Sequence, residues 1–533
     1  MKRNIIKTCV LGLGLLTLAS CDDPMDEITS LIYDRVFSPT ELETRNVQET
    51  SVTLQWNASN GAGEYNVQLF ADDSLAFEGE PDLALSTTET SIDIDGLIYD
   101  TQDSARVQAK DLEDPDRDSK WSTVAFRTAA QQIMDGITEG NTGDRYVIVT
   151  WPVGEEATSI KVMLYGTTEL AVPEHTITPE ELAAGSARIE GLNPETRYDV
   201  YLYNNGKQRG HRDFTTIADL AGATLVGPEQ NLCELLEAAT DGQVFALTGG
   251  KFVIPYDGDE EGVTVGCATI TKSITIKGVY PTNRPVINGR FQLDEGASLS
   301  LSQVVLDGTG TSGDQTFNYK TAGATYATLD VQDCEIKNYT KGLLYLNVAA
   351  TISNVTFNNC LIHDVECSGG DFLDARTGLI SSLTLTNSTI YNSAAARDFI
   401  RMDDASSSFA GAAGPTILVD HCTLDGIANN SSRRLLYVRF PGNTITFTNN
   451  MVSNMPNCGR GFSDNSATDE PDFQNNNYFN TKNLVSEGGE AKAKFFDTGG
   501  LTLDPQYVDA ANGDFTIQNE DVSTRGIGDP RWY

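Results

Sequence analysis

Seven segments in the second half of the chain repeat one phrase, and this repeat constrains the fold more than any other feature. The segments are 299–308, 329–338, 355–364, 383–392, 417–426, 445–454 and 473–480. In each, a small or polar anchor residue follows alternating apolar residues; the anchors are Val304, Cys334, Cys360, Ser388, Cys422, Asn450 and Asn476. The anchors are 30, 26, 28, 34, 28 and 26 residues apart. Such a period predicts stacked units, none of which buries its apolar face alone.

The repeated units have the pattern of β-strands. Leu, Val, Ile and Thr alternate with polar residues, and Asn, Asp or Gly stands at the bend. No helical periodicity lies between the units, so we expect each coil to stack in parallel on the next. The sequence therefore predicts an all-β chain whose residues 218–533 form a parallel β-helix. The Asn runs at 449–450 and 475–477 are predicted to form side-chain ladders between coils.

The first half contains two modules of turn-separated strands. Residues 38–129 and 130–217 each hold five runs of alternating apolar residues. The runs are 51–56, 64–70, 90–97, 105–111 and 123–128 in the first module, and 146–151, 159–165, 187–192, 197–204 and 212–216 in the second. Two sheets of this length and alternation predict a β-sandwich for each module.

The second module resembles fibronectin type III at particular residues. The tyrosine-corner phrase of that family is matched by Leu192, Pro194, Thr196 and Tyr198, and its core tryptophan by Trp151. The first module keeps Trp56 and Leu97 but has Asp103 where the corner tyrosine belongs, so its tandem position supports its membership more than its motif does. The resemblance implies that these modules are spacers, with a second ligand site as the alternative.

The region from residue 218 resembles the pectate-lyase-like right-handed parallel β-helix. A short amphipathic helix is predicted over 231–242, and strands over 243–252 and 272–279, like the N-terminal cap and first coils of that group. Segments 504–517 and 526–533 resemble its C-terminal closing segment. In sequence pattern and order, this half of the chain resembles uncharacterised β-helical modules in surface lipoproteins of gut Bacteroidota.

The N-terminus has the pattern of a lipoprotein signal. A basic start and a short apolar core over residues 1–20 end at Leu18-Ala19-Ser20-Cys21, which resembles a bacterial lipobox with Cys21 as the lipidated residue. The acidic tether over 21–37 resembles the export signal of Bacteroidota surface lipoproteins. The resemblance implies an outer-membrane protein anchored by lipid and facing the cell exterior, with a periplasm-facing anchor as the alternative.

Charge and cysteine content restrict the partners. The net charge is −38, from 75 acidic and 37 basic residues, which excludes nucleic acid because its phosphates would be repelled. Of nine cysteines, Cys334, Cys360 and Cys422 share the anchor position and are predicted to point inward. The sequence does not decide whether Cys334 and Cys360 form a disulfide. No CxxC pair or Cys/His cluster predicts a zinc site.

The strand that follows each anchor supplies the candidate site. The alternation places inward Leu344, Leu346, Leu373, Ala375, Ile400, Met402, Leu436 and Val438. Two outward columns then follow: Tyr345, Asp374, Arg401 and Tyr437 in one, and Asn347, Arg376, Asp403 and Arg439 in the other. With coils about 4.8 Å apart, these side chains are predicted to form one continuous face.

Three interpretations of this face stay open. It forms a ladder of ion pairs with a structural role, it binds a glycan through tyrosine faces and arginine forks, or it is catalytic. In the catalytic case a polysaccharide lyase acting on uronate polymers would use Arg401 or Arg439 as base. Ca²⁺ on Asp374, Asp403 and Asp404 would then neutralise the substrate carboxylate.

We expect a glycan-binding surface lipoprotein that captures an extended polysaccharide, including pectin-like uronate polymers, for a glycan-uptake system. Its partners would be the polysaccharide, the outer membrane through the N-terminal lipid, and an outer-membrane glycan importer. No resident cofactor is expected; Ca²⁺ belongs to the catalytic alternative. A polysaccharide lyase and a structural or adhesive surface protein are the alternative functions.

Overall fold

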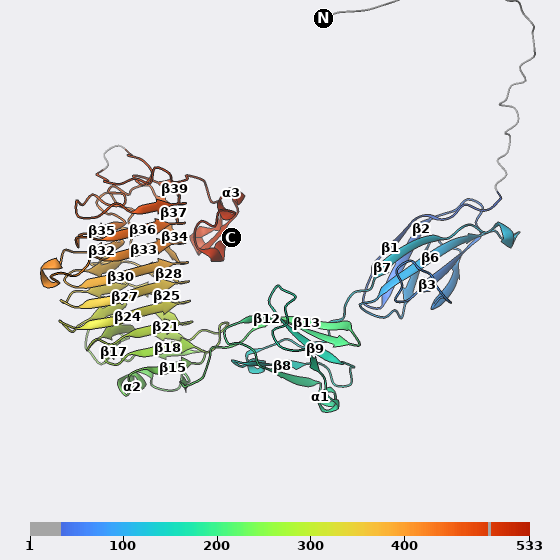
Figure 1. The fold of residues 1–533 in the computed structure, drawn as a ribbon, viewed down its shortest axis with the longest axis horizontal. Helices are drawn as coiled ribbons and strands as arrows, with labels where there is room; N and C mark the ends of the chain where they lie inside the picture. Colours follow the sequence, from blue (N-terminus) through green and yellow to red (C-terminus); the bar gives the residue numbers. More distant parts are fainter. Residues whose placement is uncertain (1–33, 489–491) are drawn as a thin grey trace, which may run out of the picture. The chain divides into compact units, whose positions relative to one another are not determined.

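The computed structural model describes residues 34–488 and 492–533, and almost every element in them is a strand (Figure 1). The chain divides into two compact units. The described part of one unit comprises residues 34–134, 155–160 and 201–211, and the other unit comprises 135–154, 161–200 and 212–533. The predicted signal peptide and Cys21 lie outside the described residues. No helix in the described part of the chain has the length and apolarity of a membrane span.

The first module is a β-sandwich of fibronectin type III-like strand order. One sheet holds β1 (Thr40–Arg45), β2 (Ser51–Asn57) and β5 (Ser91–Asp95), and the other holds β4 (Leu83–Thr87), β3 (Glu64–Phe70), β6 (Gln102–Lys110) and β7 (Ser122–Arg127). The five predicted runs correspond to β2, β3, β5, β6 and β7. Trp56 and Tyr65 pack edge to face in the core. Asp103 is buried and accepts a hydrogen bond from the Asp72 amide at 3.1 Å, so this module has a carboxylate at the corner position.

The second module contains the tyrosine corner. Strand β11 (Ser186–Glu190) pairs with β8 (Tyr146–Thr150), and four strands follow the order β10 (His175–Thr176), β9 (Ser159–Leu164), β12 (Arg197–Asn204) and β13 (Lys207–Thr215). Helix α1 (Pro179–Ala184) precedes β11. Tyr198 is buried, and its hydroxyl accepts a hydrogen bond from the Asn193 amide at 2.9 Å. Trp151 is buried as predicted.

The remaining strands form a parallel β-solenoid whose coils lie one above another in Figure 1. The ten-stranded sheet holds β14 (Ala223–Val226), β15 (Gln243–Leu247), β18 (Ile274–Gly278), β21 (Leu299–Ser302), β24 (Thr325–Gln332), β27 (Thr351–Asn358), β30 (Leu379–Thr386), β33 (Thr416–Asp420), β36 (Thr444–Thr448) and β38 (Asp472–Gln474). The nine-stranded sheet holds β16 (Lys251–Val253), β19 (Val286–Asn288), β22 (Val305–Asp307), β25 (Glu335–Tyr339), β28 (Leu361–Val365), β31 (Thr389–Tyr391), β34 (Thr423–Asp425), β37 (Met451–Met455) and β39 (Asn477–Thr481). The seven-stranded sheet holds β17 (Cys267–Ile270), β20 (Arg290–Leu293), β23 (Phe317–Tyr319), β26 (Leu344–Leu346), β29 (Leu373–Ala375), β32 (Ile400–Met402) and β35 (Leu436–Val438).

Each repeated phrase, predicted as one strand, bends in its middle into two, so a complete coil has three strands when the strand of the candidate site is included. The residue before the anchor takes a left-handed conformation, with φ of 50° at Asp333, 53° at Asn359 and 55° at Asn449. This single residue turns the chain from the ten-stranded to the nine-stranded sheet. Asn, Asp and His tolerate the left-handed region better than β-branched residues do, which explains their presence at this corner.

The anchor residues line the inside of that corner, as predicted for Cys334, Cys360 and Cys422. All seven are buried, and the polar anchors bond to a neighbouring coil. Ser388 Oγ accepts a hydrogen bond from the Cys360 amide, and Asn450 Oδ1 accepts one from the Cys422 amide, both at 2.9 Å. Asn476 Oδ1 accepts one from the backbone amide of Asn450 at 2.8 Å. The side chain of Asn475 donates to Asn449 Oδ1 at 2.8 Å, so the predicted side-chain ladder is present between these two coils. Cys334 and Cys360 are free thiols.

The segments at the two termini of the solenoid pack in different places. Helix α2 (Leu232–Glu237) places Leu232 and Leu236 on the apolar core at the first coils. The segment 504–533, predicted to close the far end, instead packs on the outer face of the nine-stranded sheet. It contains β40 (Tyr507–Asp509), β41 (Asp514–Ile517) and α3 (Glu520–Ser523). Its Ile517, Val522 and Ile527 cluster with Met451 of β37.

Candidate functional site

The predicted outward columns lie on the seven-stranded sheet in the predicted register. Tyr345 pairs with Asp374, Asp374 with Arg401, and Arg401 with Tyr437, in strands β26, β29, β32 and β35. The residues predicted to point inward are all buried in the core. Strand alternation placed this face, because neighbouring side chains on a strand point to opposite sides. Asp374 differs from the other members of the columns, since it is on the outward side and yet fully buried.

Carboxylates already hold the arginines of this face. Arg376 forms two 2.8 Å bonds with the carboxylate of Asp374, which it covers. Arg401 bonds in the same two-pronged manner to Asp403, at 2.8 and 2.9 Å. Arg439 reaches Asp403 from the next coil at 2.7 Å. The ladder of ion pairs is therefore present, whereas Asn347 is exposed and lies outside it.

Four charged residues that sequence reasoning missed extend the network. Asp371 and Asp398 are buried two residues before β29 and β32, and Arg434 is buried two residues before β35. Arg401 Nη1 lies 3.1 Å from Asp371, and Arg434 contacts Asp398 at 3.1 Å and Asp464 at 2.7 Å. Asp371, Asp398 and Arg434 each stand two residues before the start of a strand. This constant spacing is visible in the sequence and could have revealed them.

A second regularity explains why these acids are buried. The carboxylate of Asp371 accepts a hydrogen bond from the Asp398 amide at 3.1 Å, and that of Asp398 accepts one from the Arg434 amide at 3.0 Å. Each acid therefore bonds to the backbone of the following coil at the same position. Such bonds compensate for the removal of the carboxylates from water.

The two tyrosines of the face have different surroundings. Tyr437 is half-buried among the guanidinium groups of Arg401, Arg434 and Arg439, whose central carbons lie 5.4, 4.1 and 4.9 Å from the ring centre. Tyr345 is half-buried at the other end of the column. Three coil steps separate the rings, which is about 14 Å at the usual strand spacing.

The electrostatics of the network keep the arginines protonated. Burial acts to lower the pKa of Arg401, but hydrogen bonds and charges from Asp403 and Asp371 outweigh it and raise that pKa. The hydrogen bonds that Arg376 donates to Asp374 likewise raise the pKa of Arg376. A guanidinium with a raised pKa releases its proton less readily, so this geometry does not favour Arg401 as a general base.

The residues named for Ca²⁺ do not fit that ion. Asp374 binds Arg376, and Asp403 lies between Arg401 and Arg439. Asp404 is exposed, and its carboxylate accepts a hydrogen bond from the Ser406 amide at 3.1 Å. Among residues 34–488 and 492–533, no group of three or more His, Cys, Asp or Glu side chains is arranged to hold a metal ion.

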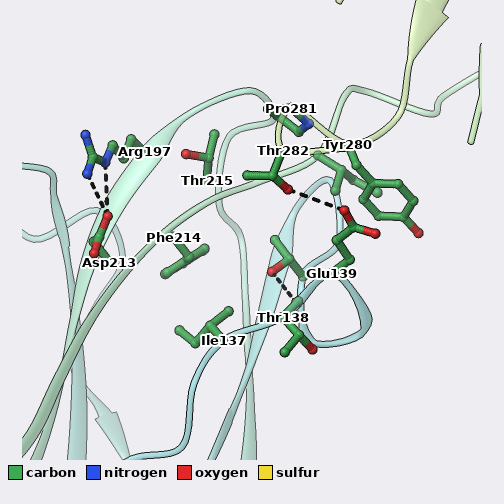
Figure 2. A pocket seen from close by; sticks show the side chains of 12 residues that line it. Ile137, Thr138, Glu139, Arg197, Asp213, Phe214, Thr215, Tyr280, Pro281 and Thr282 are labelled. Atoms are coloured by element: carbon green, nitrogen blue, oxygen red, sulfur yellow. Dashed lines mark hydrogen bonds and ion pairs between the residues drawn. The ribbon is translucent and has the colours of Figure 1, made fainter. Parts of the chain in front are cut away.

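Figure 2 shows a pocket elsewhere in the chain, with a volume of about 370 Å³. Its lining includes Glu139, Arg197, Asp213 and Thr282 and none of the residues predicted from sequence to form a site. Arg197 pairs with Asp213 at 2.7 Å, and the Thr282 hydroxyl donates to Glu139 at 3.4 Å, as the dashed lines indicate. The arginine of the pocket is thus already neutralised, and we assign this pocket no function.

Comparison with known proteins finds similarity in both halves of the chain. Residues 256–393 match a family model described as Domain of unknown function (DUF4957), and residues 417–532 match one described as Domain of unknown function (DUF5123). Each match lies within the solenoid.

The similar solved structures cover the first half. A two fibronectin type-III domain segment from chicken tenascin is 14% identical, covers 33% of this chain and 97% of its own, and has a TM-score of 0.25. The structure of FN3tt mut is 17% identical, covering 18% and 97%, with a TM-score of 0.15. The FN5 domain of Drosophila Lar is 16% identical, covering 18% and 98%, with a TM-score of 0.15.

Proposed function

We propose that this protein is a surface lipoprotein of the outer membrane that binds an extended polysaccharide on its β-solenoid. The pectate-lyase-like sequence pattern of the solenoid and the lipobox-like sequence before Cys21 support this assignment together. The two sandwiches serve as spacers between the lipid anchor and the solenoid. A neighbouring outer-membrane importer would then take up the captured glycan.

One observation carries the binding proposal. Tyr345 and Tyr437 occupy one outward column of a regular parallel sheet, with polar groups on every strand between them. Half-exposed aromatic rings stack against the C–H faces of sugar rings, and a column of strands provides a straight surface for a polymer. Arg439 is the arginine of the columns with the fewest ion pairs among the described residues, and we assign it to a carboxylate of the glycan.

Affinity electrophoresis in gels containing single polysaccharides tests this function. Polygalacturonate, pectin and uncharged plant and microbial glycans form the panel. We expect at least one polysaccharide to retard the protein, and we expect the double variant Y345A/Y437A to migrate freely in that gel. Tyr533→Ala removes a tyrosine that is 46% exposed at the C-terminus and is the matched control. Binding is excluded if no glycan of the panel slows migration.

The lipid anchor is tested separately in cells. We expect Cys21→Ala to abolish incorporation of labelled fatty acid and to release the protein from the membrane fraction. Protease added to intact cells is expected to cleave the unaltered protein, because it faces the exterior. A Cys21→Ala protein that stays in the membrane fraction would disprove the lipid anchor and leave the binding proposal standing.

A further inference from the structure

A groove runs along the ends of the nine-stranded sheet, on a different part of the solenoid from the tyrosine and arginine face. Two hollows of about 760 and 590 Å³ form it, and they share Asp364, Asn392, Ser393 and Ala395. The turns 308–311, 338–340, 364–366, 392–395 and 425–429 line it, so it crosses five consecutive coils. Residues 510–512 of the C-terminal segment form its wall at one end.

Side-chain bonds between coils fix the floor of the groove. Asn338 Nδ2 donates to Asp307 Oδ1 at 3.0 Å, and Asn392 donates in the same way to Asp364. Asn338, Asp364 and Asn392 all have left-handed backbones, with φ of 63°, 55° and 45°. The turns therefore repeat with the coil spacing of about 4.8 Å and present their polar groups in a line. A preformed line of donors and acceptors binds an extended chain without the cost of ordering loops.

The chemistry of the lining matches a hydroxyl-rich chain. Thr340 and Glu366 offer a hydroxyl and a carboxylate for which the described residues provide no side-chain partner. Tyr391 and His363 line the second hollow with their rings stacked 5.0 Å apart, and Phe515 supports Tyr391 at 5.3 Å. Hydroxyl, amide and carboxylate groups beside an aromatic ring are the groups that bind the hydroxyls and C–H faces of sugars.

The charge of the groove favours an uncharged polysaccharide over an acidic one. Asp364, Glu366 and Asp425 line it, and neither hollow has a lysine or an arginine among the described residues of its lining. His363 is paired with Asp364 at 2.7 Å and Glu335 at 3.1 Å, so its charge is already compensated. A uronate polymer would bring further carboxylates into this negative field. The selectivity is therefore opposite to that of the arginine face.

We infer that this groove is a second glycan site that binds an uncharged polysaccharide chain along the axis of the solenoid. The inference rests on the proposed function in its ligand class, and it concerns a separate surface with separate residues. The protein would then bind neutral and acidic parts of a branched glycan on different faces.

A bulky side chain placed in the groove tests this inference. Ala395 is exposed and shared by both hollows, so Ala395→Trp blocks the groove without disturbing the core. Ala349→Trp places the same side chain on an exposed turn outside the groove and is the control. Isothermal titration with soluble galactan, arabinan and xyloglucan is expected to show binding that Ala395→Trp weakens at least about tenfold, whereas Ala349→Trp leaves it unchanged. Glu366→Ala, which changes an exposed carboxylate, is expected to weaken it about threefold or more.

The outcomes separate this inference from the proposed function. If uncharged glycans do not bind, or if Ala395→Trp binds them as the unaltered protein does, the groove is not a glycan site. Polygalacturonate binding that is lost in Y345A/Y437A would still support the proposed function. Conversely, neutral binding that is lost in Ala395→Trp and retained in Y345A/Y437A supports the groove, and polygalacturonate binding that is also retained in Y345A/Y437A disproves glycan capture on the tyrosine column.

Discussion

At the scale of single residues, two outward charges of the seven-stranded sheet pair with the residue two positions further along the chain, just past the end of the strand. Asp374 with Arg376, and Arg401 with Asp403, follow this rule because residues i and i+2 share a face. Each arginine is thereby both part of the surface and part of a structural network. A binding role and a stabilising role must therefore be separated by experiment.

The first prediction concerns Asp374, which is completely buried beneath Arg376. Asp374→Ala leaves the guanidinium without its two strongest bonds, and we expect a loss of about 2–4 kcal/mol in the free energy of unfolding. Asp404→Ala removes an exposed carboxylate that bonds to Ser406 within its own turn, and it should leave the free energy of unfolding nearly unchanged. Chemical denaturation followed by circular dichroism measures both. Equal effects would contradict the buried network.

The second prediction concerns Glu335 and His363. The His363 hydrogen bond, with help from Lys337, lowers the pKa of Glu335 to about 2 against the opposing effect of burial. Burial acts to lower the pKa of His363, but bonds from Glu335 and Asp364 raise it overall. The Glu335 contribution is thus complete above its unfolded pKa of about 4.3 and is lost as the pH falls toward 2. The His363 contribution is complete below about 6.5 and is lost as the pH rises through its raised folded pKa.

Glu335→Gln tests this pair. We expect the stability difference between the unaltered protein and the variant to be largest between about pH 4.3 and 6.5, on the order of 2 kcal/mol, and to shrink on both sides. Denaturation of both proteins at a series of pH values measures the difference. A difference that does not depend on pH would show that the pair is not ionised as described.

At the scale of elements, a left-handed corner lies in each of the seven repeated phrases. The corner residue and the buried anchor are adjacent, as Asn449 and Asn450 illustrate. The repeat spacing and the alternation of each strand were predictable because both are local properties. The break inside the phrase was not predicted, since a single left-handed residue leaves the apolar alternation on either side intact. The signal that could have revealed it is the Asn, Asp or His immediately before most of the anchors.

The third prediction concerns Asn450. Its side chain accepts from the Cys422 amide at 2.9 Å and donates to the Val419 carbonyl at 3.0 Å, and it is fully buried. Asn450→Ala leaves both backbone groups without these partners and should lower stability by about 2–4 kcal/mol. Asn450→Ser should lose less, because Ser388 makes the equivalent bond two coils earlier. Thermal unfolding of the two variants is the measurement, and an alanine variant as stable as the serine variant would contradict the ladder.

At the scale of the whole solenoid, the C-terminal segment stabilises the sheet that it covers. The Asp529 carboxylate accepts a hydrogen bond from Thr389 at 2.7 Å, and the indole of Trp532 donates to the same hydroxyl at 2.7 Å. Ile527 is completely buried in the interface. The segment also supplies the wall of the groove, so its attachment affects both stability and the inferred site.

The fourth prediction concerns this attachment. Ile527→Asp places a charge in an apolar contact and should release the segment from the sheet. We expect faster hydrogen exchange in 504–533 and in β34 and β37, while the first coils keep their protection. Arg525→Asp, a charge change at an exposed position of the same segment, is the control. Unchanged exchange in the Ile527→Asp protein would show that the segment is held by other contacts.

The parallel β-helix, the inward anchors and the register of the tyrosine and arginine columns were readable from the sequence, because each depends on residues close together along a strand or on the period of the repeat. The place of the C-terminal segment and the groove beside it were decided by the tertiary structure alone. Thr389 and Asp529 meet although they are 140 residues apart, and no local pattern specifies that contact. Contacts of this kind depend on the shape of the completed sheet, which exists only after the coils have stacked.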